Sequence, residues 1–231
     1  MRINKNKKIN GFTLIEIMIA MFIFGIIITT IFSSYNAIMT RSQALDEGME
    51  VFEMAKNCIT RITQDLELLY SAQPPLYTRP QLYGPKDVYQ FVGTVSYLNA
   101  TNFPKLRFTS LAHVNFENEE NTGICEIVYY VQQEEDGSII LKRADNIYPY
   151  PEFIEKTSDP TLCIRVKSFS LTYYDQNNKD FDVWDSESDD FQFSIPKRIR
   201  VNLEIGDETN FKVFETSVMI ACARGPVTSG K

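Results

Sequence analysis

The feature that most constrains this chain is a long segment without proline that is apolar at first and amphipathic afterwards. No proline occurs between Phe12 and Pro74, and no charge occurs between Ile17 and Thr40. Because an α-helix rises about 1.5 Å per residue, the uncharged stretch is long enough to cross the roughly 30 Å hydrocarbon core of a membrane. The sequence therefore predicts a membrane-spanning helix over residues 12–40.

The residues before this segment are basic. They carry four cations and no acid, at Arg2, Lys5, Lys7 and Lys8. Positive charge flanking a membrane span favours the cytoplasmic side. We therefore expect a single-pass membrane protein with a cytoplasmic N-terminus and its C-terminal domain on the other side of the membrane.

One carboxylate, Glu16, lies just inside the apolar segment. A charged side chain at the centre of a bilayer costs about 2.5–3.5 kcal/mol on insertion scales, so such residues usually have a function and a partner. We interpret Glu16 as a residue that pairs with a cation inside the membrane.

A processing site is expected before the apolar segment. A secretory signal peptide carries its cleavage site after the apolar region, whereas here the candidate junction, Gly11-Phe12, precedes it. Glycine lets the backbone fit closely into a protease cleft. Cleavage would create an amine on Phe12 that could neutralise Glu16 of a neighbouring subunit. The alternative is an uncleaved anchor with a snorkelling glutamate.

The run from Gly11 to Glu16 resembles the class III signal of type IV pilins and pseudopilins. This resemblance implies cleavage between Gly11 and Phe12 by a prepilin peptidase. It also implies N-methylation of Phe12 and a role in assembly for Glu16, the fifth residue after the cut.

Beyond the apolar segment, the helical pattern continues. Apolar residues recur every three or four positions at Leu45, Met49, Phe52, Ala55, Ile59, Ile62, Leu66 and Leu69. The opposite face carries Asp46, Glu47, Glu50, Glu53, Lys56, Arg61, Asp65 and Glu67. This pattern predicts one helix from about Phe12 to Tyr70, whose distal part packs on its own domain.

The rest of the chain is predicted to form strands separated by polar turns. The expected strands are Val88 to Leu98, Lys105 to Leu111, Cys125 to Gln132, Ser138 to Arg143, Cys163 to Tyr174, Lys197 to Ile205 and Phe211 to Cys222, with a hairpin turn at 135–137. The fold class is therefore α+β, a long helix on an antiparallel β body. The expected divisions are a leader (1–11), a membrane helix (12–40), its amphipathic continuation (41–72) and a β-rich periplasmic domain (73–231).

Several segments of the distal helix and the β region resemble a more specific family. They are RITQDL at 61–66, VYYV at 128–131, LKR at 141–143, VKSFSLTYYD at 166–175, WD at 184–185 and PKRIRV at 196–201. Together they are similar to the J subunit of the general (type II) secretion pathway, a minor pseudopilin with a pilin-like fold.

This resemblance implies that the protein joins minor pseudopilins of the I, K and H types, and a major pseudopilin, in a hetero-oligomer at the tip of a periplasmic pseudopilus. A minor pilin of a type IV pilus or of a competence system is the alternative.

Charge and composition exclude other functions. The formal net charge is −7, and without the four leader cations 19 basic residues face 30 acidic ones, which disfavours binding to nucleic acid. His113 is the single histidine of the chain, and glycine-rich phosphate loops are absent. We therefore predict a protein without catalytic activity and without a cofactor.

Two features are left open by the sequence. The acidic segment 175–190 contains Asp175, Asp180, Asp182 and Asp185, which could supply oxygen ligands to Ca²⁺, but it lacks EF-hand spacing, and a solvated loop is the preferred interpretation. The cysteines, Cys58, Cys125, Cys163 and Cys222, have no metal-binding spacing. They could pair in an oxidising compartment or remain buried thiols, and the sequence does not define a pairing.

Overall fold

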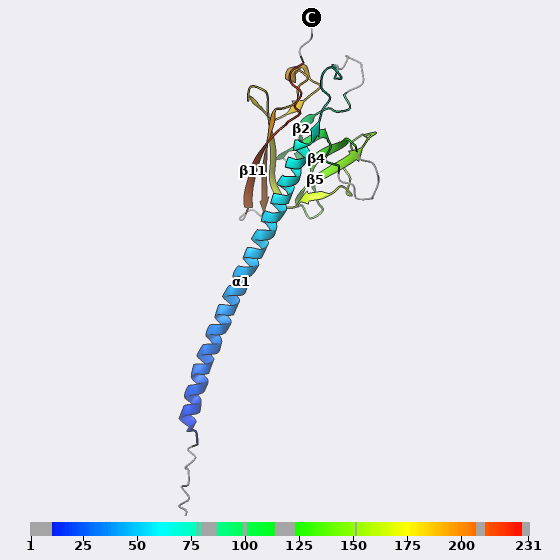
Figure 1. Cartoon of the computed structure of the whole chain (residues 1–231). Helices are drawn as coiled ribbons and strands as arrows, with labels where there is room; N and C mark the ends of the chain where they lie inside the picture. The colour runs from blue at the N-terminus through cyan, green and yellow to red at the C-terminus, as the bar shows by residue number, and fades with distance from the viewer. Residues whose placement is uncertain are drawn as a thin grey trace, which may run out of the picture. The chain divides into compact units, whose positions relative to one another are not determined.

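The computed structural model describes residues 11–77, 79, 87–98, 101–113, 123–150, 152–206 and 211–227. The basic leader lies outside these ranges. The first element is α1 (Leu14–Glu67), a 54-residue helix that confirms the helix predicted from the apolar spacing (Figure 1). The chain divides into two compact units, Met1–Glu50 and Val51–Lys231.

In the first unit, α1 has the properties of a lipid-facing helix. The most apolar window of 18 residues within Leu14–Thr40 has a mean hydropathy of 2.5, and none of that window is buried within the protein. The hydroxyls of Thr29, Thr30 and Thr40 each donate a hydrogen bond to a backbone carbonyl three or four residues earlier. Their polar groups are thus satisfied inside the helix, as an apolar environment requires.

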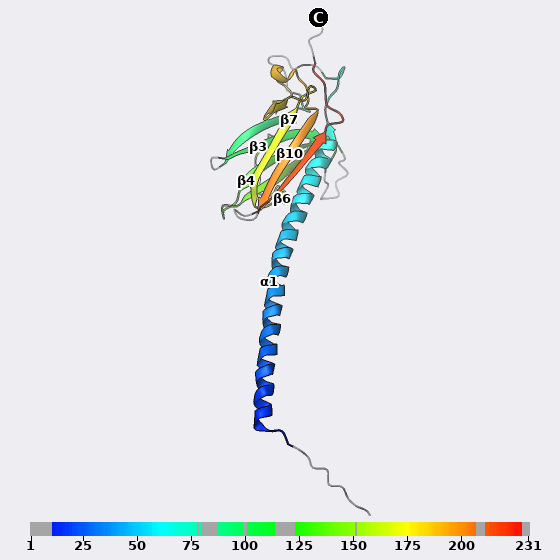
Figure 2. The same cartoon turned by 90° about the vertical axis from the view of Figure 1, so that its left-hand side faces the viewer.

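The second unit combines the distal part of α1 with two antiparallel sheets (Figures 1 and 2). Its strands are β1 (Leu69–Tyr70), β2 (Val92–Leu98), β3 (Thr101–Ser110), β4 (Cys125–Gln133), β5 (Ile139–Ile147), β6 (Thr161–Cys163), β7 (Val166–Tyr174), β8 (Asp180–Phe181), β9 (Trp184–Asp185), β10 (Arg198–Gly206) and β11 (Phe211–Met219), with a 3₁₀ turn η1 (Asp189–Phe191). One sheet has the order β6-β5-β4-β3-β2-β9, with β1 also paired to β3, and the other has the order β11-β10-β7-β8. This architecture confirms the α+β fold class.

The core takes residues from α1 and from both sheets. On α1, Ala55, Cys58, Ile62 and Leu66 recur every three or four residues and are almost fully buried, together with residues such as Tyr129 and Leu203 from the two sheets. The predicted apolar stripe is thus confirmed in its distal part. Further upstream, Met49 is 60% exposed, and the side chain of Leu45 lies outside the described part of the structure.

The helix ends where the backbone turns into the sheet. After Glu67 the chain enters β1, which pairs with the end of β3. The Ser110 hydroxyl donates hydrogen bonds to the carbonyls of Asp65 and Leu68, which satisfies acceptors that the last helical turn would leave without partners.

One predicted strand was wrong. The run from Cys163 to Tyr174 is divided between β6 and β7, which belong to different sheets. The backbone at Arg165 has φ 54°, a left-handed conformation that breaks the extended run. Arginine gives no sequence signal for this conformation. Glycine does, and Gly137, with φ 86°, lies in the predicted turn between β4 and β5.

The two sheets approach closely where Gly93 of β2 faces Tyr173 of β7. A Cβ atom on Gly93 would lie 2.2 Å from the Tyr173 hydroxyl oxygen and 2.4 Å from Cζ. Tyr173 is fully buried, and its hydroxyl has no hydrogen-bond partner among the residues that the structure describes.

We expect Gly93→Ala to lower the free energy of unfolding by about 1–3 kcal/mol, because the added methyl group displaces a buried ring. Tyr173→Phe should change it by less than about 1 kcal/mol, since it removes a hydroxyl without a partner. Denaturant unfolding of the full chain in detergent, followed by fluorescence of the buried Trp184, measures both changes. Equal effects of the two substitutions would contradict this account of the contact.

Candidate functional site

The predicted processing junction lies at an accessible position before α1. Gly11 and Phe12 precede the first helical residue, Leu14, and both are exposed, with 86% of the Phe12 surface accessible. A protease must bind several residues of its substrate in an extended form, and a junction outside the helix meets this requirement. That the chain is cleaved there stays a prediction.

Glu16 has a structural role that the sequence analysis missed. Its Oε2 atom accepts hydrogen bonds from the backbone N–H and from the hydroxyl of Thr13, each at 2.8 Å. The Thr13 hydroxyl in turn accepts the N–H of Glu16 at 3.4 Å. This reciprocal pair is a capping box, and its signature, threonine followed three residues later by glutamate, was readable in the sequence.

The cap does not use the whole carboxylate. An ionised carboxylate offers about four acceptor sites, and the two bonds from Thr13 occupy two of them. Glu16 can therefore hold the helix end and also accept a bond from a cation outside the chain. The carboxylate remains a candidate for assembly.

The surface around this carboxylate is apolar. Every side chain from 11 to 40 is exposed in the isolated chain, and most of those from 14 to 32 are isoleucine, methionine, phenylalanine or alanine. A helix that is apolar on all sides is stable in lipid or against other apolar helices. The first unit can thus bind a membrane and neighbouring helices with the same surface.

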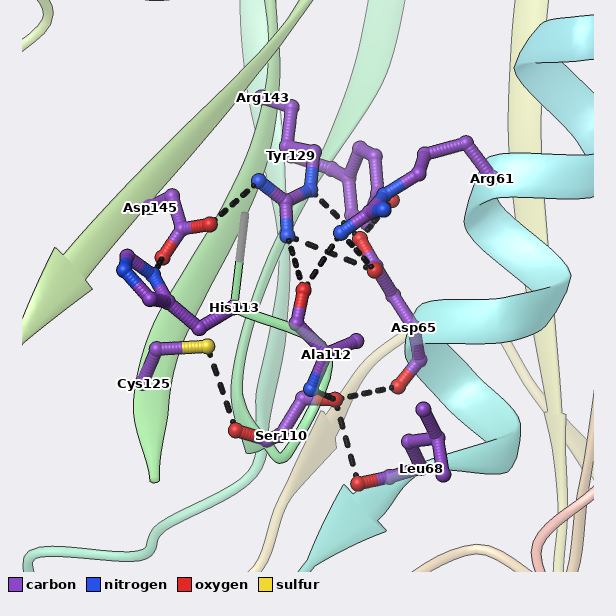
Figure 3. A network of polar contacts seen from close by, with 10 residues as sticks. All are labelled: Arg61, Asp65, Leu68, Ser110, Ala112, His113, Cys125, Tyr129, Arg143 and Asp145. Carbon is purple, nitrogen blue, oxygen red and sulfur yellow. Dashed lines mark hydrogen bonds and ion pairs between the residues drawn. The ribbon is translucent and has the colours of Figure 1, made fainter. Parts of the chain in front are cut away.

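In the second unit, a buried carboxylate joins α1 to the larger sheet (Figure 3). Asp65 is 0% exposed, although the sequence pattern placed it on the polar face of the helix. It accepts hydrogen bonds from the Tyr129 hydroxyl at 2.5 Å and from Arg143 Nε at 2.6 Å. Arg61, one turn earlier on α1, forms an ion pair with the same carboxylate at 2.8 Å. The expected polar position is therefore corrected to a buried, fully paired one.

The same network extends to the single histidine. Arg143 Nη1 contacts Asp145 Oδ2 at 2.8 Å, and Asp145 Oδ1 lies 2.9 Å from His113 Nδ1. The two guanidinium groups also converge on the carbonyl of Ala112, from Arg61 at 2.5 Å and from Arg143 at 3.2 Å. The segment after β3 is thus tied to both α1 and β5.

This network brings together residue types that serve catalysis or metal binding elsewhere. Donor atoms of His113, Cys125 and Asp145 all lie within 4.8 Å of one another. However, the buried Cys125 thiol donates a hydrogen bond to the Ser110 carbonyl, and burial raises the pKa of this thiol to about 12. A thiolate, which is the form that attacks substrates and binds metals, is therefore scarce at neutral pH. Two of the three side chains also contact residues outside this group: Cys125 contacts Ser110, and Asp145 contacts Arg143.

In the acidic segment 175–190, two of the carboxylates considered as Ca²⁺ ligands accept backbone N–H groups instead. Asp175 Oδ1 accepts the N–H groups of Asn177 and Lys179, and Asp185 Oδ1 accepts that of Glu187. These bonds close turns next to β8 and β9. Within the part of the chain that the structure describes, the acids of this segment do not form a three-donor cluster of the kind found at His113. A solvated loop stays the preferred interpretation of this segment, and calcium binding by Asp175, Asp180, Asp182 and Asp185 stays the untested alternative.

Comparison with known proteins gave two family matches. The family described as type II secretion system (T2SS), protein J, matches residues 33–214, more than three quarters of the chain. The family described as the prokaryotic N-terminal methylation motif matches residues 6–32, which include Gly11, Phe12 and Glu16. No curated protein matches this chain.

We expect Asp65→Ala to lower the free energy of unfolding by about 3–5 kcal/mol, because it leaves two guanidinium groups without their buried anion. Glu53→Ala, which removes an exposed acid from the same helix, should change it by less than about 0.5 kcal/mol. Thermal and denaturant unfolding of the full chain in detergent would show the difference.

The paired replacement Asp65→Leu with Arg143→Met tests whether the two residues act together. It should cost about 1–3 kcal/mol less than the sum of the single replacements, because neither charge is then left alone. Strict additivity would show that the ion pair contributes little to the packing of α1.

Proposed function

The chain belongs to the type II secretion system protein J family, and on this premise we propose that it is a minor pseudopilin of the pseudopilus tip. There it joins other minor pseudopilins, initiates assembly and supports export of folded proteins across the outer membrane. The observation that carries the proposal is the protein J match, which covers the distal two thirds of α1 and nearly all of both sheets.

The apolar helix and the methylation motif together indicate anchoring in the inner membrane. The basic leader supports a cytoplasmic N-terminus and a periplasmic second unit. In this orientation a prepilin peptidase cleaves between Gly11 and Phe12 at the cytoplasmic face. N-methylation of Phe12 follows, and the apolar helix remains part of the mature protein.

Assembly then depends on the first unit. The new amine of one subunit and the Glu16 carboxylate of its neighbour neutralise each other within the membrane. The exposed side chains from 14 to 40 pack against partner helices, as an unpaired apolar surface requires. Because partners supply different helices, the contacts are heterologous.

Membership in the family implies partners within the secretion machinery. We propose that these are the minor pseudopilins of the I, K and H types and the major pseudopilin. The role is structural: the protein positions its neighbours and carries out no reaction. An excess of acidic residues in the mature chain supports protein partners over nucleic acid.

Three substitutions separate the two roles of Glu16. Glu16→Ala removes the charge and the cap, Glu16→Gln keeps a side chain that can complete a capping box, and Thr13→Ala removes the cap but keeps the charge. We expect both Glu16 variants to reduce incorporation into the pseudopilus about tenfold or more, because each leaves the Phe12 amine of a neighbouring subunit unpaired in the membrane. An unpaired charge there costs about 2.5–3.5 kcal/mol, and 1.4 kcal/mol corresponds to a factor of ten. Thr13→Ala should retain most incorporation.

Site-specific crosslinking to neighbouring subunits and secretion of the natural substrate measure this effect. Mass spectrometry must first show a mature N-terminus at methylated Phe12 in each variant, so that failed processing is not read as failed assembly. Normal incorporation of Glu16→Gln would refute the charge pairing, and loss in Thr13→Ala alone would assign the effect to the cap.

The tip position is tested by co-purification. We expect the second unit of this protein to form a stable complex with the corresponding units of I-type and K-type pseudopilins from the same organism, in equal numbers. Size-exclusion chromatography with light scattering measures the composition. Absence of a complex, together with normal secretion and lost surface fibres in a deletion strain, would favour the minor pilin of a type IV pilus or competence system.

A further inference from the structure

Two of the four cysteines meet in the core of the second unit. Cys58 lies on the inward face of α1, and Cys163 is the last residue of β6. Each is about 1% exposed, and both belong to the same hydrophobic cluster. Their side chains interact, since Cys163 is the strongest influence on the pKa of the Cys58 thiol, so the two side chains are neighbours although 104 residues of sequence separate them.

The other two cysteines are placed differently. The Cys125 thiol is hydrogen-bonded to the Ser110 carbonyl, beside Asp145 and His113, and Cys222 is exposed in a turn after β11. The structure therefore selects one pairing from the six that four cysteines allow.

We infer that Cys58 and Cys163 form a disulfide bond in the exported protein, which joins α1 covalently to the edge of the larger sheet. This inference rests on the proposed function for the oxidising compartment, since disulfides persist in the periplasm and are rare in the cytosol. Cys58 is seen here as a thiol, so the bond is a modification of the structure described.

The bond forms by exchange with the disulfide of a thiol oxidoreductase. One cysteine thiolate attacks that disulfide, gives a mixed disulfide and releases one enzyme thiol. The second cysteine thiolate then attacks the mixed disulfide, forms the Cys58–Cys163 bond and releases the other enzyme thiol. Two protons and two electrons pass from the cysteine pair to the enzyme, which leaves as a dithiol.

The reaction must precede closure of the core. The neighbouring Cys163 side chain and burial both raise the pKa of the Cys58 thiol, so the folded, reduced protein holds almost no thiolate at this position. The buried pair is also out of reach of an enzyme. Oxidation is therefore fast while the chain is folding and slow once the core is closed.

The position of the pair gives the bond a structural purpose. β6 has three residues, and its pairing with β5 includes a register shift between Leu141 and Lys142. A short edge strand with irregular pairing has few hydrogen bonds to hold it. A disulfide from the last residue of β6 to α1 holds the strand in place. It also lowers the conformational entropy of the unfolded chain, which stabilises the folded state.

The test is peptide mapping of the full chain after refolding in detergent with a mixture of reduced and oxidised glutathione. We expect a linked peptide that contains Cys58 and Cys163, with Cys125 and Cys222 alkylated directly. The oxidised protein should melt about 5–15 °C above the reduced one. This shift should vanish in Cys58→Ala and Cys163→Ala and persist in the matched control Cys222→Ser.

The same mapping applies to protein taken from cells under conditions that trap thiols. A linked peptide that contains Cys58 and Cys163 supports the bond, whatever the secretion phenotype. Free thiols at both positions in refolded protein, or in cellular protein with a mature Phe12 N-terminus, overturn the bond and leave the proposed function standing. A different pairing also overturns it.

Discussion

The structure of the second unit depends on a buried carboxylate. Asp65 lies in the core without contact to water, and a charge in this position is tolerated because Tyr129, Arg143 and Arg61 all point at it. These partners come from β4, from β5 and from the preceding turn of α1. If the helix were rotated or shifted by one turn, the carboxylate would lose both of its sheet partners and keep only Arg61 of its own helix. The network therefore penalises other packings of α1 more strongly than apolar contacts alone would.

Fixing the helix in this way divides its surface between two tasks. The face with Ala55, Ile62 and Leu66 is buried in the core of the second unit. The side chains from 11 to 40 are left without cover from their own chain and need lipid or partner helices. One continuous helix thus supplies both a fold and an assembly surface, which agrees with membership in a family of structural proteins. The Cys125, His113 and Asp145 constellation fits the same interpretation, since its thiol is held in the unreactive form.

Periodicity was enough to predict the helix, its buried distal stripe and most strands, because these depend on residue types that are close in sequence. It failed where a contact joins distant residues. Asp65 was assigned to the polar face since acids are rarely buried, and its partners Tyr129 and Arg143 lie 64 and 78 residues away. The left-handed backbone at Arg165, which sends β6 and β7 into different sheets, has no signal in the residue type. The capping box of Thr13 and Glu16 was visible in the sequence, and it was overlooked because Glu16 was considered only as a partner for another subunit.

The capping box also bears on how the proposed processing would drive assembly. The N-terminal end of a helix carries a partial positive charge, and cleavage before Phe12 adds a full positive charge next to it. The subunit's own Glu16 is turned back onto Thr13, one residue beyond the new amine. The Glu16 carboxylate already balances the partial positive charge of its own helix end. The amine on Phe12 would therefore add a positive charge in an apolar region without a second carboxylate to balance it. A second carboxylate, from a neighbour, would remove this imbalance, so the proposed cleavage would convert a helix that is electrically satisfied alone into one that requires a partner.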